Sequence, residues 1–185
     1  MRTALAHADR YSRGAIWLHW VIAVLVIVNL LIGLLHESLL NGVKGAIPLH
    51  KSIGITVLAL TLARIAWRLG HRPPPLPASM TGWSRLAAHA AHAGLYALLL
   101  ALPLTGWIMT SGARVPRPTS FFGLFDLPLL PVSRALGGAA HESHGLLGWV
   151  MLLLVGIHVA AALRHHFMLR DSVLARMIPG LSVRR

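Results

Sequence analysis

Four apolar segments dominate this chain of 185 residues and limit what it can fold into. They cover about residues 14–35, 47–69, 83–111 and 141–167. A helix rises ~1.5 Å per residue, so roughly 20 apolar residues cross the ~30 Å hydrocarbon core of a bilayer. Each segment is long enough for one crossing. The sequence therefore predicts an all-α, integral membrane four-helix bundle, built as a single transmembrane domain over residues 1–185.

The composition agrees with a membrane protein, because 56% of the residues are hydrophobic and only 12% are charged. The formal net charge of +12 would also suit a nucleic-acid-binding protein. The basic residues flank the apolar segments rather than forming one patch, as membrane topology requires, so we exclude nucleic acid as a partner. The first apolar segment is too long for a cleavable signal peptide and is followed by further segments.

The positions of the basic residues predict the orientation of the chain. The N-terminus, the region around the second connection and the C-terminal end together hold Arg2, Arg10, Arg13, Arg64, Arg68, Arg72, Arg85, Arg164, Arg170, Arg176, Arg184 and Arg185. The opposite side holds Lys44, Lys51, Arg114, Arg117 and Arg134. Cytoplasmic loops are enriched in Lys and Arg, so we expect both termini in the cytoplasm.

The connections between the segments differ in length. Residues 36–46 form a short turn, and residues 70–82 form a proline-rich linker that cannot continue a helix. Residues 112–140 form a longer connection rich in Gly and Pro, which contains the stretch FFGLFDLPLLP. We expect that stretch to lie on the membrane surface.

The chain contains no cysteine and twelve histidines. Without cysteine it cannot form disulfides, thiolate-bound iron–sulfur clusters or covalently attached c-type haem. Histidine is then the candidate ligand for a metal or a cofactor, because a neutral imidazole nitrogen binds iron well.

Four histidines match in depth once the orientation is assigned. His19 and His158 lie toward the cytoplasmic side, whereas His50 and His144 open their helices at the outer side. His144 and His158 lie on nearly the same face of one helix, ~21 Å apart. Each pair joins two helices across a bundle interior, where such folds hold cofactors. Two imidazoles at one depth suit the axial positions of a b-type haem iron.

Glycines accompany the outer pair. Gly54 follows His50 by about one helical turn, and Gly148 follows His144 in the same way. A missing side chain at both positions would let a flat macrocycle approach the helices.

Other histidines compete for these roles, since a histidine in an apolar helix often only hydrogen-bonds a neighbouring helix. His89 and His92 lie at the cytoplasmic level and would replace His19 or His158 as ligands. Alternatively they bind a haem propionate or a quinone headgroup, which is the role we favour. We expect no ligand role for a group of interfacial and loop residues, which are His7, His36, His71, His165 and His166.

Several ordered motifs resemble the bacterial cytochrome b561 family. They are RYSRGAIWLHW, IPLHKSIGITVLALTLARIAWRL, LAAHAAHAGLYALLLALPLTGW, FFGLFDLP and HVAAALRHHFMLRDSVLARMIPG, and they cover nearly the whole chain. This family is related to the di-haem cytochrome b subunits of nickel hydrogenases and formate dehydrogenases. The resemblance implies an inner-membrane protein with two non-covalent haems b. By position, the family's ligands fall on His19 and His158 for one haem and on His50 and His144 for the other.

One part of the ligand assignment stays open. This chain has HESHG where relatives often show one histidine, so His141 is an alternative to His144 as the outer ligand. His141 matches His158 less well in helical phase than His144 does.

Some members of the family oxidise superoxide at the outer haem and pass the electron to ubiquinone. The resemblance therefore implies a superoxide:ubiquinone oxidoreductase, that is, a superoxide oxidase. Lys51 lies beside His50, and with the other outer basic residues it would form a cationic rim that attracts a small anion. Arg13 and Arg64 lie near the inner level and are candidates to pair with haem propionates.

Two other functions remain open at this point. The chain would otherwise be a membrane-anchor subunit that connects a soluble dehydrogenase or hydrogenase to the quinone pool, although its short loops offer little docking surface. A histidine-lined transporter or metal channel is the other alternative.

Overall fold

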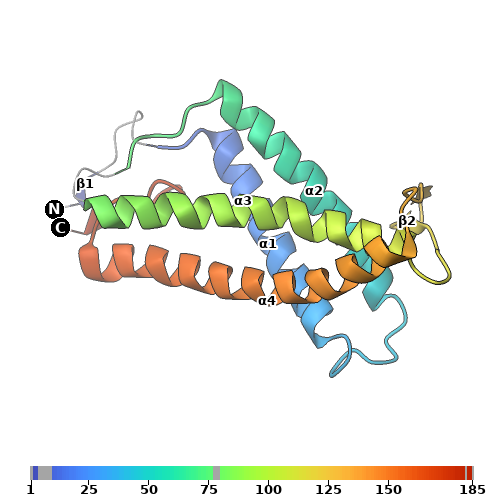
Figure 1. Cartoon of the computed structure of the whole chain (residues 1–185). Coiled ribbons are helices and arrows are strands. Elements are labelled where there is room, and N and C mark those ends of the chain that lie inside the picture. Colours follow the sequence, from blue (N-terminus) through green and yellow to red (C-terminus); the bar gives the residue numbers. More distant parts are fainter. Residues whose placement is uncertain (1, 4–9, 77–79, 182, 185) are drawn as a thin grey trace.

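The computed structural model describes residues 2–3, 10–76, 80–181 and 183–184, in which four long helices form one bundle (Figure 1). The helices are α1 (Arg13–Leu35), α2 (Ala46–Gly70), α3 (Gly82–Ser111) and α4 (Arg134–Arg164). All four are long and apolar enough to cross a membrane. The predicted all-α membrane bundle is therefore confirmed. His7 lies outside the described residues.

Capping residues explain where the helices begin. The hydroxyl oxygens of Ser12, Thr81 and Ser133 each accept a hydrogen bond from a backbone N–H in the first turn of α1, α3 and α4. Such caps satisfy N–H groups that have no partner within the helix. α2 instead follows Gly45, whose φ of 98° is readily adopted only by glycine.

α4 begins earlier than its expected start near His141, because it starts at Arg134. Its first turns pack against the end of α3, where Gly112 and Gly137 touch through their backbones. A Cβ on Gly137 would lie 2.6 Å from the carbonyl oxygen of Gly112. Residues 134–140 were expected in the connection, and they contain Gly137 and Gly138, which have low helix propensity. The close packing of α4 against α3 outweighs that low propensity.

The connection between α3 and α4 contains a small hairpin that the sequence analysis did not predict. Strand β2 (Thr119–Phe121) pairs antiparallel with β3 (Phe125–Leu127). The hairpin is attached to α2, since the hydroxyl of Ser52 accepts a 3.0 Å hydrogen bond from the N–H of Phe122. Leu124 at the tip is 77% exposed. An exposed apolar tip suits a membrane surface, and the expected position of this stretch there stays a prediction.

The end of α4 turns back onto the bundle. The helix continues as the π-helix η2 (His165–Leu169), and the ring of His165 pairs with the carboxylate of Asp171 at 2.5 Å. Trp20 of α1 donates a 2.8 Å hydrogen bond to the carbonyl oxygen of Met177. These contacts hold the C-terminal segment across the end of the bundle.

The two chain ends lie at the same end of the bundle (Figure 1). Strand β1 (Arg2–Thr3) pairs antiparallel with β4 (Val183–Arg184). Four crossings return the chain to the side on which it started, so this arrangement agrees with both termini on one side of a membrane.

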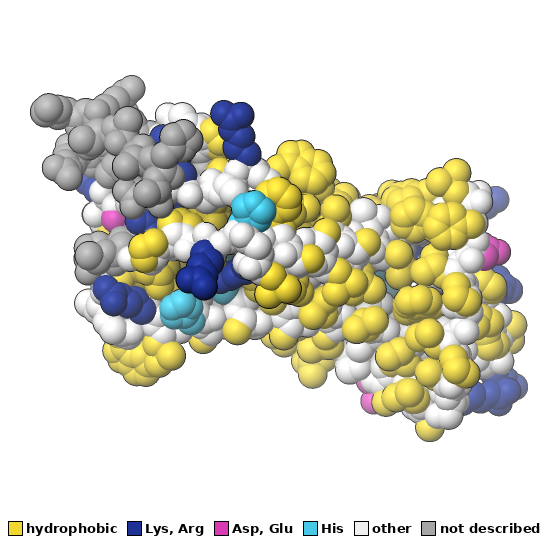
Figure 2. Space-filling view, turned by 90° about the horizontal axis from the view of Figure 1, so that it is seen from above, with side chains coloured by type: hydrophobic (Ala, Val, Ile, Leu, Met, Phe, Trp, Pro, Cys, Tyr) yellow, Lys and Arg dark blue, Asp and Glu magenta, His cyan; other side chains and the backbone are white. Residues whose placement is uncertain are grey.

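The outer surface of the bundle is apolar in its middle. Figure 2 shows hydrophobic side chains over the central part of one face, with Lys and Arg gathered toward the two ends. Large apolar side chains such as Trp149, Leu153 and Ile157 of α4 are more than half exposed. The interior between the helices is filled by a cluster of Ile22, Val26, Ile53, Val57, Leu98 and Met151.

The contact between Gly112 and Gly137 predicts a position-specific effect on stability. In Gly137→Ala the added methyl group would strike the backbone of α3, so we expect a lower free energy of unfolding by about 1–3 kcal/mol. In Gly138→Ala the methyl group meets no atom within 4 Å, so this control should be unchanged or slightly stabilised. Thermal unfolding in detergent measures both. Equal midpoints for the two variants would contradict the assigned packing.

Candidate functional site

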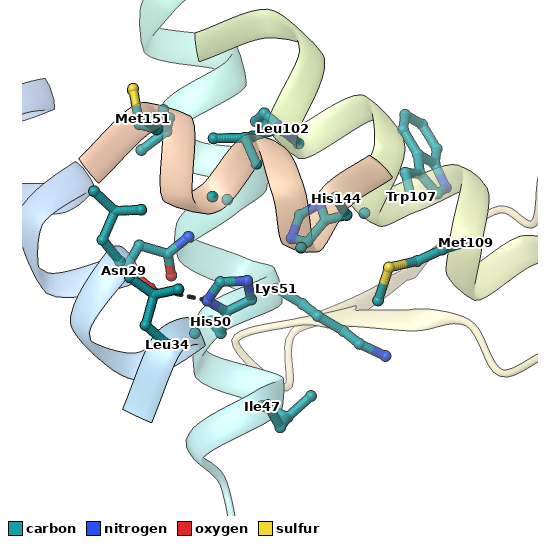
Figure 3. A pocket seen from close by; sticks show the side chains of 18 of the residues that line it. Asn29, Leu34, Ile47, His50, Lys51, Leu102, Trp107, Met109, His144 and Met151 are labelled. Carbon is teal, nitrogen blue, oxygen red and sulfur yellow. Dashed lines mark hydrogen bonds between the residues drawn. The ribbon is translucent and has the colours of Figure 1, made fainter. Parts of the chain in front are cut away.

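His50 of α2 and His144 of α4 face each other across a cavity of about 470 Å³ (Figure 3). Their ring centres lie 6.1 Å apart, and the ring planes are inclined by 82°. Thr119 of the hairpin also lines this cavity, which places it toward the end of the bundle opposite the termini. The structure thus brings together the outer pair that the sequence analysis matched by depth.

Both rings of the outer pair are fixed through their Nδ1 atoms. His50 Nδ1 lies 3.1 Å from the carbonyl oxygen of Asn29 in α1, shown as a dashed line in Figure 3. His144 Nδ1 lies 3.0 Å from the hydroxyl oxygen of Thr105 in α3. When Nδ1 carries the proton, Nε2 is left with a free lone pair for a metal. Two neighbouring helices thus orient the two rings.

Glycines make room for the same two rings. A Cβ on Gly33 would lie 2.7 Å from His50 Cε1, and a Cβ on Gly106 would lie 3.3 Å from His144 Cε1. The predicted Gly54 and Gly148 line the cavity as well. Gly54 and Gly148 therefore lie beside the cavity, as expected. Gly33 and Gly106 have a different steric role, because they let α1 and α3 approach the imidazoles.

The inner level holds three histidines from three helices. The ring centres of His19 in α1 and His158 in α4 lie 6.2 Å apart. His92 of α3 lies 5.5 Å from His158. His89 is exposed. The structure therefore brings His19 to His158 as expected, and it also brings the competitor His92 next to the same ring.

The spacing within each matched pair fits one iron between two imidazoles. A ring nitrogen binds a metal at ~2.0 Å and lies ~1.1 Å from its ring centre, so two opposed rings have centres ~6.2 Å apart. The separations of 6.1 and 6.2 Å agree with this value. The 5.5 Å between His92 and His158 is too short for opposed ligands. The outer cavity also has the size of a cofactor pocket, which is ~300–1,000 Å³.

The other predicted site residues take different positions. Lys51 is half-buried and lines the outer cavity beside His50 (Figure 3). His141 lines the cavity but is exposed, whereas the ring of His144 faces His50. Arg13 is exposed at the start of α1. The Nε of Arg64 donates a 2.9 Å hydrogen bond to the hydroxyl of Tyr96.

The sequence analysis missed several residues of the outer site. Asn29 and Thr105 are polar residues inside apolar segments, which is a signal of function in a membrane helix. Their assignment to particular histidines needed the structure. His36, which was expected in a loop, lies in the turn directly after α1 and also lines the cavity.

Comparison with known proteins gives a consistent result. A model of the family described as prokaryotic cytochrome b561 matches residues 10–180. The chain is 36% identical to cytochrome b561 homolog 2 of Escherichia coli K12 over 92% of each chain. It is 31% identical to "Probable superoxide oxidase CybB" of Yersinia pestis, covering 92% of this chain and 96% of that protein. Cytochrome b561 homolog 1 of Escherichia coli K12 is 28% identical over 92% of this chain.

Four helices that are long and apolar enough to cross a membrane, with histidines facing each other between them, are typical of membrane-bound electron-transfer proteins of the cytochrome b class. The match over residues 10–180 makes the assignment specific, and the chain belongs to the prokaryotic cytochrome b561 family. The resemblance found in the sequence motifs is thereby confirmed. Membership implies haem b, electron transfer and a multi-pass position in the bacterial inner membrane.

The close contact of Gly33 with His50 predicts a loss of haem. In Gly33→Ala the methyl group would overlap the imidazole and turn it away from the cavity, so we expect less haem b per purified chain. Gly138→Ala, which meets nothing within 4 Å, is the control. Absorption spectra of the reduced protein measure the haem content. A Gly33→Ala variant with the haem content of the control would show that this glycine is not needed to seat His50.

Proposed function

We propose that the chain holds two haems b, with His50 and His144 as axial ligands of the outer haem and His19 and His158 as those of the inner one. The observation that carries this proposal is the spacing of the rings, because both pairs have the separation of opposed imidazole ligands. When bound, the haems supply one-electron redox chemistry, and with both axial positions taken, electron transfer is favoured over oxygen binding.

His92 has a different role in this proposal. The ring centres of His92 and His158 lie 5.5 Å apart, which is too close for two imidazoles on opposite sides of the same iron. We assign His92 and His89, both exposed on α3, to contact a quinone headgroup or an inner haem propionate. Arg13 and Arg64 are the proposed cationic partners of propionates, and Arg64 has its guanidinium held by Tyr96.

The specific reaction that we propose is superoxide:ubiquinone oxidoreduction. Two superoxide anions each give up one electron and leave as O₂, and one ubiquinone takes up the two electrons and two protons to become ubiquinol. The similarity to "Probable superoxide oxidase CybB" supports this choice. With both termini in the cytoplasm, as the basic residues predict, the superoxide would react at the outer side.

Lys51 is the residue that we propose attracts superoxide. It is half-buried, lines the outer cavity and follows His50 in the chain. A positive charge at a low-dielectric opening raises the local concentration of a small anion and its rate of encounter.

Haem content and the pairing of ligands can be tested together. We expect two haems b per purified chain with a low-spin reduced-minus-oxidised spectrum. His50→Ala and His144→Ala should each remove the same haem, because they delete opposite ligands of one iron. His92→Ala should keep both haems. Loss of the inner haem in His92→Ala would overturn the inner assignment, and the absence of a low-spin b-type signal would favour a transporter instead.

The role of Lys51 predicts a salt-dependent rate. Lys51→Gln should slow superoxide oxidation with ubiquinone as acceptor by roughly twofold to tenfold at low ionic strength, and the difference should shrink as salt rises. Arg164→Gln is the control, since Arg164 is exposed at the far end of α4, does not line the cavity and lies outside the predicted cationic rim. Stopped-flow measurement on the purified chain gives the rate. If the purified chain oxidises superoxide only after a soluble partner is added, the anchor-subunit alternative is favoured.

A further inference from the structure

The two histidine pairs differ in how their rings are held. In the outer pair, each Nδ1 has a hydrogen-bond partner on a neighbouring helix, namely the carbonyl oxygen of Asn29 and the hydroxyl of Thr105. In the inner pair, His19 and His158 contact other rings, and neither ring makes a hydrogen bond within the part of the chain that the structure describes.

The direction of the Thr105 hydrogen bond follows from its other contacts. The hydroxyl of Thr105 has one hydrogen, and two backbone carbonyl oxygens of α3 are placed to accept it, that of Ala101 at 2.8 Å and that of Leu102 at 3.0 Å. Toward His144 the hydroxyl oxygen therefore accepts, and the Nδ1–H of His144 donates. His50 also donates from Nδ1, because its partner is a carbonyl oxygen. Both outer rings thus donate and present Nε2 to the cavity.

A donating Nδ1–H changes the ring as a ligand. The hydrogen bond shifts electron density toward the other nitrogen, which becomes a more basic donor. A more basic axial ligand stabilises ferric over ferrous iron and so lowers the reduction potential of a haem. Two such bonds act on the outer pair, whereas the described residues supply none to the rings of the inner pair.

Nearby cations do not remove this difference. A cation favours the reduced haem, and both levels have cations near them: Lys51 follows His50 at the outer level, and Arg64 and Arg68 both lie over the ring of Tyr96 near the inner level. Lys51 lines the outer cavity, whereas the half-buried Arg64 donates a hydrogen bond to Tyr96. Two of these cations lie at the inner level and one beside the outer pair, so their effect does not reverse the order of potentials that the hydrogen bonds give.

We infer that Thr105 and the backbone carbonyl of Asn29 are positioning groups that make the outer haem the lower-potential one of the two. This inference rests on the proposed function, because it needs a haem at each pair. Electrons move spontaneously toward the higher potential, so the pair of sites carries them from the outer side to the inner side. The hydrogen bonds at Nδ1 of His50 and His144 then set the direction of electron flow.

A redox titration of the purified holoprotein tests the inference. His19→Ala and His144→Ala assign each midpoint to one haem, and the outer haem should have the lower value. Thr105→Val keeps the shape of the side chain and removes the hydroxyl. At a fixed ambient potential, Thr105→Val should raise the ratio of reduced to oxidised outer haem by about tenfold. This ratio corresponds to a midpoint potential that is higher by ~59 mV for a one-electron couple.

Matched variants separate this effect from a general loss of structure. Thr105→Ser restores the acceptor and should return the potential toward the wild-type value. Thr56→Val is the control, because the Thr56 hydroxyl donates to the carbonyl of Ser52 one turn back, as that of Thr105 does in α3, yet it hydrogen-bonds no histidine among the described residues. It should leave both potentials unchanged, and the inner potential should be unchanged in Thr105→Val.

The outcomes distinguish this inference from the proposal on which it rests. Fewer than two haems in the wild type would overturn the proposed function itself. Two haems with the lower potential at the inner site, or no selective shift of the outer haem in Thr105→Val, would overturn the inference alone. If Thr105→Val fails to retain the outer haem, the order of the two wild-type potentials still decides whether the inference holds.

Discussion

The seating of His50 and His144 is the constraint on which the arrangement of the four helices depends. α2 and α4 supply the rings, while α1 supplies the carbonyl of Asn29 and the space at Gly33, and α3 supplies the hydroxyl of Thr105. Every helix therefore contributes to one pair of imidazoles. Burying a polar ring in an apolar bundle costs free energy that a hydrogen bond to the ring offsets, so the partners of His50 and His144 favour helices that meet at these positions.

The rest of the interior keeps the two histidine levels apart. Met151 lies midway along α4 between His144 and His158 and belongs to the buried apolar cluster, together with residues such as Val57 and Leu98 from the neighbouring helices. This apolar layer separates the two levels, which lie ~21 Å apart along the axis of a regular helix. Beyond the outer level, the backbones of Gly112 and Gly137 touch and close the bundle. The space for a cofactor thus lies between regions of tight packing.

A single helix, α4, carries one histidine at each level, His144 and His158. A small electron-transfer protein needs its redox centres held on one rigid support, and a continuous helix provides it. The remaining ligand candidates come from α1 and α2, whose hydrogen-bonding surroundings differ. The two histidine pairs are therefore held by different contacts, the outer pair by hydrogen bonds and the inner pair by neighbouring rings.

Much of this protein can be read from its sequence, since the length of an apolar segment and the spacing of residues within one helix are local properties. The four crossings and the shared face of His144 and His158 follow from them, and so does the match in depth between histidines of different helices. The start of α4, the hairpin at the outer end and the partners Thr105 and Gly33 were decided by the tertiary structure. The physical reason is that these helices are apolar on all sides, as lipid demands, so their hydrophobic pattern does not say which face turns inward. Only the packing of one helix against another fixes which polar group meets which imidazole.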